Sequence, residues 1–401
     1  MNFKREEIKP KYIWIIDIWT YKIRVWICKM LNRNVELIWY WEKRQDTNDI
    51  NLQEISNLES VCESINQAIE KAQIDAKIKI NDYIINIPSQ NLFFESSKIN
   101  FIRENNDKDI DEEELYGILK NIETQAFKNH YKRIKDNTGF SKNDLKLIIS
   151  NFSNINADEK SSKTLLWLNP NEINISILNI FITENKFELK NYISKYIKKD
   201  IVNIIPSEFA LLWLFSERKN VVIIDLWNSH TSIIVKKDND VLWAKKLAFW
   251  INDLIKQIRS NYNLTKNDII NKIDENVFEN EKIEFLEIFK DILSITLDEI
   301  LKKEICPENF FMVWWWANKF IKDYLQETSF DNNELKLAKK IKFISPKIDF
   351  IDDKITENPE WINWVKSNLN IYAMIKTTLD LIKKDKSKLE RTIKEIVEEI
   401  N

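Results

Sequence analysis

The sequence predicts a mixed α/β protein with more than one domain. Two stretches, residues 13–27 and 221–235, each contain a β-branched apolar run that ends in an aspartate, then a polar turn and a second strand. A third stretch, residues 310–320, predicts a strand, a turn and the start of a helix. At 401 residues the chain is longer than a typical single domain, so we expect two or more domains.

The first half of the chain begins with a predicted three-stranded meander and a helix at 58–76, where apolar residues recur at helical spacing. A small module follows between residues 83 and 183. Its pattern predicts two strands, a helix, a strand, a polar loop and a last long strand. The predicted elements are strands 12–18, 22–30, 35–40, 82–87, 96–102, 144–151 and 172–183, helix 113–126 and loop 153–163.

The second half alternates helices and strands. Pro206 opens a helix well, because the missing N–H of proline has no partner in the first helical turn. The two strands at 221–235 lead into a hairpin whose turn lies at 238–240. The predicted elements are helices 186–197, 209–216, 254–261, 285–302 and 318–326 and strands 201–205, 221–226, 231–235 and 310–313, with short helices over 264–286.

The turns in the stretches 13–27, 221–235 and 310–320 suggest phosphate binding. A strand–turn–strand with an acid at the strand end can hold phosphates on turn amides and place a carboxylate near their metal ion. Such turns need glycine, because only a residue without Cβ lets backbone approach a phosphate closely. Tryptophan stands there instead, at Trp19, Trp227 and 314–316.

The composition is unusual in the same two residue types. Globular proteins average about 7% glycine, whereas this chain has 2 glycines and 15 tryptophans in 401 residues. Two interpretations are open. UGA codons that mean glycine in the source organism were rendered as tryptophan, which suits the abundance of Ile, Lys and Asn expected from an AT-rich genome. Alternatively, the protein is truly rich in tryptophan and carries stacking or carbohydrate-binding surfaces.

With glycine in place of tryptophan, the three stretches become IDIGTYKIRVGI, IDLGNSHTSIIV and VGGGANKF. These are similar to the two phosphate motifs and the adenosine motif of actin-like ATPases, in the same order. The module at 83–183 resembles the 1C (SHS2) domain of the FtsA family of bacterial actin-like division proteins, in which a short glycine-containing turn matches residues 163–168. The resemblance covers residues 11–380.

The resemblance implies a two-lobed actin-like ATPase built from ribonuclease H-like repeats, with a small inserted SHS2-type domain. It divides the chain into subdomain 1A, the insert (1C), subdomains 2A and 2B, and a C-terminal amphipathic helix. The boundaries are 1–82 and 184–218 for 1A, 83–183 for the insert, 219–258 and 305–380 for 2A, 259–304 for 2B, and 381–401 for the helix.

The resemblance also implies a binding site for ATP and Mg²⁺. Asp17 and Asp225 would face each other across the cleft and hold a hydrated Mg²⁺, although strand-end acids also cap turns. Glu208 would orient the attacking water, or simply favour a helix N-terminus. The residues expected to contact nucleotide are Asp17, Trp19, Thr20, Lys22, Asp225, Trp227, Asn228, Ser229, Trp250, Glu299, Trp314, Trp315, Trp316 and Ala317.

The second phosphate turn departs from the FtsA pattern. Asn228, Ser229 and His230 stand where the family has further glycines and a threonine, and Ser232 stands where it often has aspartate. These departures leave ATP binding as the expectation and put hydrolysis in doubt, so turnover should be slow or absent.

The family's function is to form filaments and to tether FtsZ to the inner face of the cytoplasmic membrane at the division site. The implied partners are the FtsZ C-terminal tail, near residues 259–304, other copies of the chain through the insert, and a membrane surface through residues 383–401. The last segment carries an apolar stripe, Leu389, Ile393, Ile396, Val397 and Ile400, but has no aromatic residue and nearly balanced charge, so packing on the protein itself is the alternative.

Two alternatives come from the same superfamily. A PilM-like scaffold of type IV pilus assembly shares the motifs and a similar insert. A sugar kinase would need a catalytic aspartate in a substrate cleft and larger insertions, and neither is evident.

Bulk properties exclude other classes. The net charge of −3 argues against a nucleic-acid binder, and three cysteines without metal spacing favour a reducing compartment. The chain has 2 histidines, so a histidine-based metal site is not expected. We find no signal-peptide pattern and no apolar run long enough to span a membrane, and we expect a cytoplasmic protein.

Overall fold

The computed structural model divides the chain into two compact units. Unit 1 comprises residues 1–214, 349–366 and 370–401, and unit 2 comprises residues 215–348 and 367–369. The structure describes residues 11–400 except for 20–21, 32–33, 47–48, 52–53, 79–81, 89–90, 105–106, 228–229, 248, 274, 276, 314–317, 329, 331–334, 347–354, 357–368 and 385–387.

Unit 1 contains a six-stranded sheet with the order β11-β6-β1-β2-β3-β17. β1 pairs antiparallel with β2 and parallel with β6, which pairs parallel with β11. Predicted strand positions are confirmed here, with ends that differ by a few residues. The strands are β1 (Lys11–Ile18), β2 (Lys22–Leu31), β3 (Asn34–Arg44), β6 (Asp82–Asn86), β11 (Asp200–Ile204) and β17 (Ile355–Thr356), with a separate pair β4 (Ile50–Asn51) and β5 (Glu54–Ile55).

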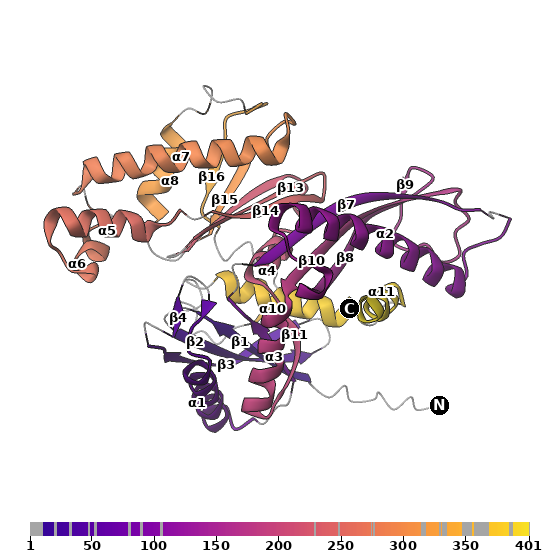
Figure 1. Ribbon diagram of the computed structural model, residues 1–401, viewed down its shortest axis with the longest axis horizontal. Coiled ribbons are helices and arrows are strands. Elements are labelled where there is room, and N and C mark those ends of the chain that lie inside the picture. Colours follow the sequence, from indigo (N-terminus) through magenta and orange to yellow (C-terminus); the bar gives the residue numbers. More distant parts are fainter. Residues whose placement is uncertain are drawn as a thin grey trace. The chain divides into compact units, whose positions relative to one another are not determined.

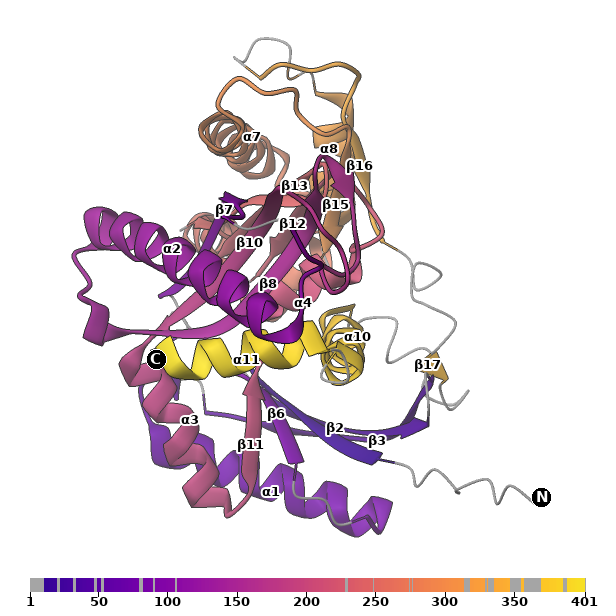
Figure 2. The ribbon, with the colours of Figure 1, turned by 90° about the vertical axis from the view of Figure 1, so that its right-hand side faces the viewer.

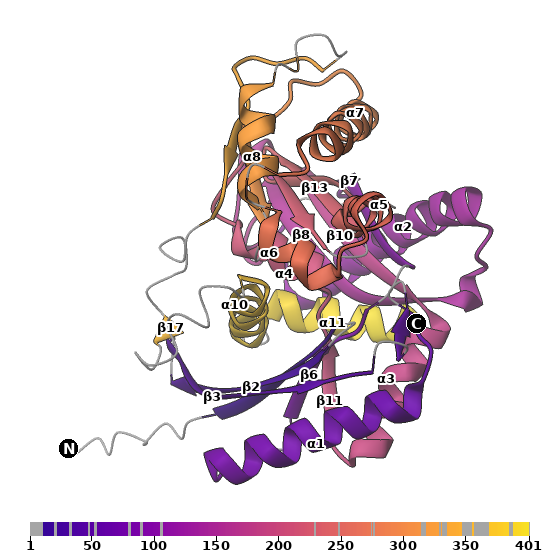
Figure 3. The same ribbon diagram turned by 90° about the vertical axis from the view of Figure 1, so that its left-hand side faces the viewer.

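Two helices cover one face of this sheet. α1 (Leu58–Ala76) and α3 (Glu184–Ile197) pack their apolar stripes against alternate residues of the strands, such as Trp14 and Ile16. α1 has the predicted bounds. Its start is fixed by Asn57, whose side chain caps the first turn by accepting from Ser60 N at 3.2 Å. Figures 2 and 3 show α10 (Leu369–Lys384) on the opposite face of the sheet. The short helix α4 (Ser207–Leu214) follows β11.

The insert is a four-stranded sheet, β7-β10-β8-β9, covered by the long helix α2 (Glu112–Thr138). Asp111 caps the start of α2 by accepting from Glu114 N at 2.9 Å, and Gly139, at φ 79°, ends it. The strands are β7 (Leu92–Ile102), β8 (Leu145–Ala157), β9 (Lys160–Ser161) and β10 (Glu172–Thr183), and a 3₁₀ turn lies at Lys142–Asp144.

Two predicted elements of the insert, helix 113–126 and strand 144–151, are shorter than the observed ones. The helix continues past residue 126, because His130 and Ile134 extend its buried stripe by two more turns. The polar loop predicted at 153–163 is largely strand, since Phe152, Ile155 and Ala157 are buried between polar residues along β8.

A polar layer separates two apolar clusters between α2 and the sheet. Glu123 is fully buried and accepts from Ser150 Oγ and from Asn179 Nδ2, both at 2.7 Å. Burial raises the pKa of the Glu123 carboxyl. His130, also fully buried, lies 2.9 Å from Ser97 Oγ through Nε2. The layer fixes the register of α2 on the sheet, because each polar group needs its own partner.

Unit 2 contains a five-stranded sheet with the order β14-β13-β12-β15-β16 and four helices that share one apolar core with it. Figure 1 shows this unit in its pink to orange part. The elements are β12 (Val221–Leu226), β13 (Thr231–Lys237), β14 (Asp240–Leu247), α5 (Ile251–Tyr262), α6 (Lys266–Lys272), α7 (Glu279–Leu301), β15 (Asn309–Val313), α8 (Asn318–Glu327) and β16 (Lys342–Ile344).

The two large sheets repeat one topology. In each, a first strand pairs antiparallel with the next strand and parallel with a strand that comes after a helical segment. β1, β2, β3, β6 and β11 thus correspond to β12, β13, β14, β15 and β16. The repeat makes Asp17 and Asp225 equivalent, each near the end of the first strand.

The C-terminal helix α11 (Lys388–Ile400) packs on the insert, against α2 and β8 (Figure 2). Ile393 and Ile396 are buried in the same apolar cluster as α2, and Val397 and Ile400 pack against it. Glu399 accepts from Tyr116 Oη and from Lys120 Nζ, both at 2.7 Å. The apolar stripe predicted from the sequence is therefore covered by the protein itself in this structure. The side chain of Leu389 lies outside the described residues.

The insert should lose stability in acid through His130. Burial lowers the pKa of this imidazole from 6.5 to about 3, with a smaller contribution from Arg133. A base whose pKa is depressed by folding stabilises the fold above its unfolded pKa, and that contribution is lost as the pH falls below 6.5. Between pH 7.5 and pH 4 the loss should be about 3 kcal/mol, and His130→Gln should remove it.

Urea unfolding at several pH values measures this effect. His230→Gln is the matched control, because it changes the only other histidine and lies in unit 2. An acid-dependent loss that persists in His130→Gln and disappears in His230→Gln would contradict the assignment.

Candidate functional site

The first predicted phosphate turn is closed by a backbone hydrogen bond from Trp19 N to Lys22 O at 2.9 Å. Thr20 lies outside the described residues. Since β1 and β2 continue in register from this turn, Asp17 comes directly opposite Arg24. Both side chains are about 1% exposed, so the aspartate is almost entirely removed from water.

Both carboxylate oxygens of Asp17 have partners. Arg24 Nη2 donates to Oδ2 at 2.5 Å, and Asn86 Nδ2, from β6, donates to Oδ1 at 2.9 Å. The guanidinium of Arg24 also lies over the indole of Trp19, 3.4 Å from the ring centroid. The indole therefore stacks on the guanidinium at the first phosphate turn.

Lys22, predicted to contact phosphate, is paired too. Its Nζ lies 2.7 Å from Glu42 Oε2, which also accepts from Tyr40 Oη at 2.5 Å. Partial burial by itself raises the pKa of Glu42, but the hydrogen bonds from Lys22 and Tyr40 hold that pKa below its ordinary value. Burial and the bond to Glu42 raise the pKa of Tyr40. The four charged groups of this turn, Asp17, Glu42, Lys22 and Arg24, sum to zero.

The second turn repeats the first. Trp227 N donates to His230 O at 2.8 Å, and Asp225 pairs in register with Ser232. Asp225 is 2% exposed, and the indole Nε1 of Trp227 donates to its Oδ2 at 2.5 Å. The indole also stacks on His230, with ring centroids 5.7 Å apart. Asn228 and Ser229 lie outside the described residues.

Other predicted site residues lie on the expected elements. Glu208 is buried in the first turn of α4, 3.3 Å from Ser207 Oγ. Glu299, on α7, is half exposed and pairs with Lys245 at 2.9 Å. Trp250 precedes α5 with an extended backbone, φ −155°, which any residue can adopt. Trp314, Trp315, Trp316 and Ala317 lie outside the described residues, between β15 and α8.

One tryptophan has a backbone that favours glycine. Trp167, in the segment compared with a glycine-containing turn, has φ 64° and is 69% exposed. A positive φ is rare for a bulky residue. The neighbouring loops are held by Arg103, whose Nε, Nη1 and Nη2 make five hydrogen bonds, to Glu114, Asn169, Pro170 and Lys108.

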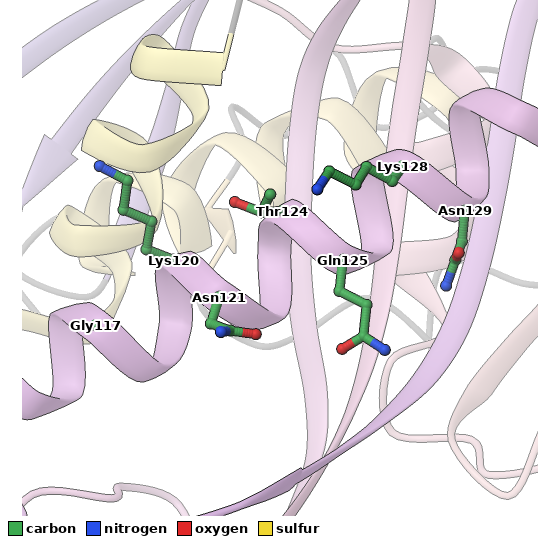
Figure 4. A pocket seen from close by; sticks show the side chains of 7 residues that line it. All are labelled: Gly117, Lys120, Asn121, Thr124, Gln125, Lys128 and Asn129. Atoms are coloured by element: carbon green, nitrogen blue, oxygen red, sulfur yellow. The ribbon is translucent and has the colours of Figure 1, made fainter.

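A surface hollow in the described part of the chain lies away from these turns. It follows the exposed face of α2 in the insert and contains none of the predicted nucleotide residues (Figure 4). The lining residues all come from this one helix, and apart from Gly117 their side chains are polar or cationic: Gly117, Lys120, Asn121, Thr124, Gln125, Lys128 and Asn129. Its ionisable groups are Lys120 and Lys128, and Lys120 is paired with Glu399 at 2.7 Å.

The turns do not fit the predicted Mg²⁺ as they stand. The oxygens of Asp17 are taken by Arg24 and Asn86, and Asp225 accepts from the indole of Trp227. Within the described ranges, no three His, Cys, Asp or Glu side chains come together in a way that could hold a metal ion. No helix in those ranges is both long and apolar enough to cross a membrane.

Sequence reasoning missed Arg24, Asn86 and Glu42. One signal was available, because an arginine at a core position of an apolar strand needs a buried acid partner. With the turn closed between residues 19 and 22, the antiparallel register places residue 24 opposite residue 17.

Comparison with known proteins identifies the fold. No family model matches the chain, and no curated protein matches its sequence. The PilM chain of a PilM–PilN type IV pilus biogenesis complex superposes with a TM-score of 0.60 at 10% identity, covering 90% of this chain and 97% of that chain. The chain thus has the actin-like ATPase fold, as the sequence predicted.

Two further structures match at lower similarity. EutJ from Carboxydothermus hydrogenoformans has a TM-score of 0.43 at 8% identity and covers 82% of this chain and 85% of its own. A protein with an actin-like ATPase fold and unknown function from Bacteroides thetaiotaomicron has a TM-score of 0.38 at 9% identity, with coverage of 91% and 95%.

The bond from Trp227 to Asp225 should stabilise unit 2. Trp227→Phe keeps an aromatic ring but removes the indole donor, which should lower the free energy of unfolding by about 1–2 kcal/mol. Trp250→Phe is the control, because Trp250 lies before a helix in the same unit. Urea unfolding measures both, and equal losses in the two variants would contradict the role of the indole N–H.

Proposed function

We propose that this protein is a nucleotide-binding scaffold of the PilM and FtsA kind, which holds a peptide segment of a membrane-associated partner. The observation that carries the proposal is the end-to-end likeness to PilM. Residues 83–183 make up about a quarter of the 401-residue chain, more than the tenth that lies outside the match. This coverage supports a likeness that includes part of the insert.

The nucleotide part of the proposal is supported by the paired turns. Two equivalent strand–turn–strand elements, each with a buried aspartate, recur at equivalent places of the two sheets. The third predicted turn, at residues 314–317, lies outside the described residues, after β15, the strand equivalent to β6. We propose ATP as the ligand, with its phosphates on the first two turns and its adenosine on the third. Hydrolysis is not part of the proposal, because Glu208 alone is a candidate to orient a water.

We propose that the nucleotide-binding form carries glycine at Trp19, Trp227 and residues 314–316. In this structure the indoles at the first two turns stack on Arg24 and bond to Asp225, where backbone should face phosphate. Trp167 adds support from a third place, since its positive φ is the conformation that glycine adopts freely. Recoded UGA codons would account for all three observations.

The PilM-like role is favoured over the FtsA-like role by the C-terminal helix. An FtsA-like tether would present the apolar face of residues 383–401 to the membrane. Here Ile393 and Ile396 are buried on the insert, so membrane binding requires α11 to leave this position. The FtsA-like role, with filaments and an FtsZ tail as partner, is the second candidate, because the ordered motifs and the insert suit both.

Peptide mass analysis of the protein from its native cells tests the glycine proposal. We expect glycine masses at positions 19, 227 and 314–316, in peptides that span residues 11–30, 219–236 and 307–320. Peptides without tryptophan, such as residues 172–183, are the control, because their masses are the same under either interpretation. Tryptophan masses at these positions would end the recoding idea and remove the open phosphate turns.

Peptide binding separates the two candidate roles. We expect the 401-residue chain to bind a short peptide of a PilN-type partner at least ten times more tightly than an FtsZ C-terminal tail, as measured by fluorescence anisotropy. Scrambled peptides are the controls. The reverse preference, together with liposome flotation that is lost when the chain ends at Lys386, would replace the PilM-like role by the FtsA-like one.

A further inference from the structure

The exposed face of α2 carries two parallel rows of side chains to which the proposed function assigns no role. Each row has i, i+4 spacing, so its members lie one above the other on the helix, about 6 Å apart along the axis. The cationic row consists of Lys120, Thr124, Lys128 and Lys132, and the amide row consists of Gly117, Asn121, Gln125 and Asn129. All of them except Lys132 line the hollow on α2, and Figure 4 shows the two rows pointing to opposite sides of the helix.

The cationic row already holds a carboxylate from another part of the chain. Lys120 Nζ, at its first position, donates to Glu399 of α11 at 2.7 Å, and Tyr116 Oη donates to the same carboxylate at 2.7 Å. Lys128 and Lys132 are exposed, and neither makes an ion pair with another residue in the part of the chain that the structure describes. The row therefore offers two further cations to carboxylates of another molecule.

The surroundings of these two lysines are positively charged. Between residues 120 and 137 the exposed charged side chains of α2 are five cations and one acid: Lys120, Lys128, Lys132, Arg133, Lys135 and Asp136. The acids that reach this face from other elements are paired, Glu95 with Arg133 at 2.8 Å and Glu399 with Lys120. The chain as a whole has a net charge of −3, so this face differs in sign from the rest and favours an acidic occupant.

Gly117 begins the amide row without a reason in the packing of the protein itself. Glycine inside a helix lowers its stability relative to alanine, and this chain has 2 glycines in 401 residues. A Cβ at Gly117 would meet no atom within 4 Å, so the fold does not require glycine there. The missing side chain instead leaves room for the backbone of an approaching segment.

The spacing of the rows matches an extended peptide. Alternate residues of an extended chain lie about 6.6 Å apart on the same side, close to the spacing of about 6 Å within each row. The side-chain amides of Asn121, Gln125 and Asn129 each provide donors and an acceptor, as a peptide backbone requires. Carboxylates at alternate positions of the peptide would then face Lys128 and Lys132 in charge-assisted hydrogen bonds.

We propose that this face of α2 binds an extended segment of a partner protein that carries acidic side chains at alternate positions. The backbone of the segment lies in the hollow along the amide row, and its carboxylates pair with Lys128 and Lys132. The interaction goes beyond the proposed function, because it requires neither the phosphate turns nor a nucleotide and lies within the insert.

Fluorescence anisotropy of labelled octapeptides with the 401-residue chain tests the proposal. The probe alternates glutamate and serine, and a block peptide of four serines followed by four glutamates has the same composition without the alternation. In about 20 mM salt, where surface charges are weakly screened, we expect the alternating acidic peptide to bind at least about fivefold more tightly than the block peptide. A peptide that alternates lysine and serine should not bind.

A double charge reversal, Lys128→Glu with Lys132→Glu, locates the binding face. We expect it to weaken binding of the alternating acidic peptide at least about tenfold and to create binding of the alternating lysine peptide. Lys195→Glu with Lys199→Glu is the matched control, because it makes the same change of charge at the same spacing elsewhere in unit 1. The control should bind the acidic peptide as the unchanged chain does.

Gly117→Leu separates binding from folding. Leucine at this position meets no neighbouring atom with its Cβ and favours the helix, so Tm should stay the same or rise. The added side chain fills the hollow, so we expect the acidic peptide to bind at least about threefold more weakly. Unchanged peptide binding in this variant would overturn the placement of the segment in the hollow.

Three results would overturn the proposal as a whole. The first is that the alternating acidic peptide does not bind, and the second is that the two double variants weaken its binding equally. The third is that the chain self-associates in sedimentation velocity, that Lys128→Glu with Lys132→Glu abolishes this, and that the peptide does not bind, which would make the face an interface between copies. The proposed nucleotide function stands or falls separately, because it depends on other residues.

Discussion

The buried ion pair between Asp17 and Arg24 is the interaction on which the first turn of unit 1 depends. β1 lies between β6 and β2 in the sheet and is buried on both faces. An aspartate near its end is therefore removed from contact with water. A charge in that position must be paired, because an isolated buried carboxylate is costly. Arg24 and Asn86 provide the pairing from the two neighbouring strands, and thereby join β2, β1 and β6 at the edge where the turn begins.

The same physics acts differently on the second repeat. Asp225 is as deeply buried as Asp17, but its neighbours in register are Ser232 and Val313, which carry no charge. The indole N–H of Trp227 then becomes a partner of its carboxylate. A duplicated fold therefore gives two equivalent carboxylates different donors, a guanidinium at Asp17 and an indole N–H at Asp225.

The insert and the C-terminal helix form a second self-contained arrangement in unit 1. The amphipathic pattern of residues 389–400 is strong enough to suit either a membrane or a protein surface, since both reward burial of an apolar face. The insert supplies the protein surface between α2 and β8, and Lys120 and Tyr116 supply partners for Glu399. The ion pair between Lys120 and Glu399 is half exposed and contributes little to stability by itself. Burial of the apolar face therefore holds the helix in place.

The sequence by itself determined most of the local structure. Period-two and helical patterns predicted α1 and β10 with their observed bounds, and the buried runs that end in aspartate predicted the strands that lead into both turns. These features depend on contacts within a few residues, so neighbouring side chains suffice to specify them. The partner of Asp17 in β2 was also implicit, because a turn closed between residues 19 and 22 fixes that register.

Only the tertiary structure decided which residues from distant parts of the chain contact Asp17 and the last helix. Asn86 reaches Asp17 across 69 residues of chain, and Ile396 meets the insert more than 200 residues after α2. No local pattern encodes these contacts, because they depend on the order in which strands join the sheet and on which apolar face is left for the last helix. For that reason the sequence predicted a site that includes Asp17, while the fold decided that Asp17 is paired with Arg24 and that the last helix is covered by the insert.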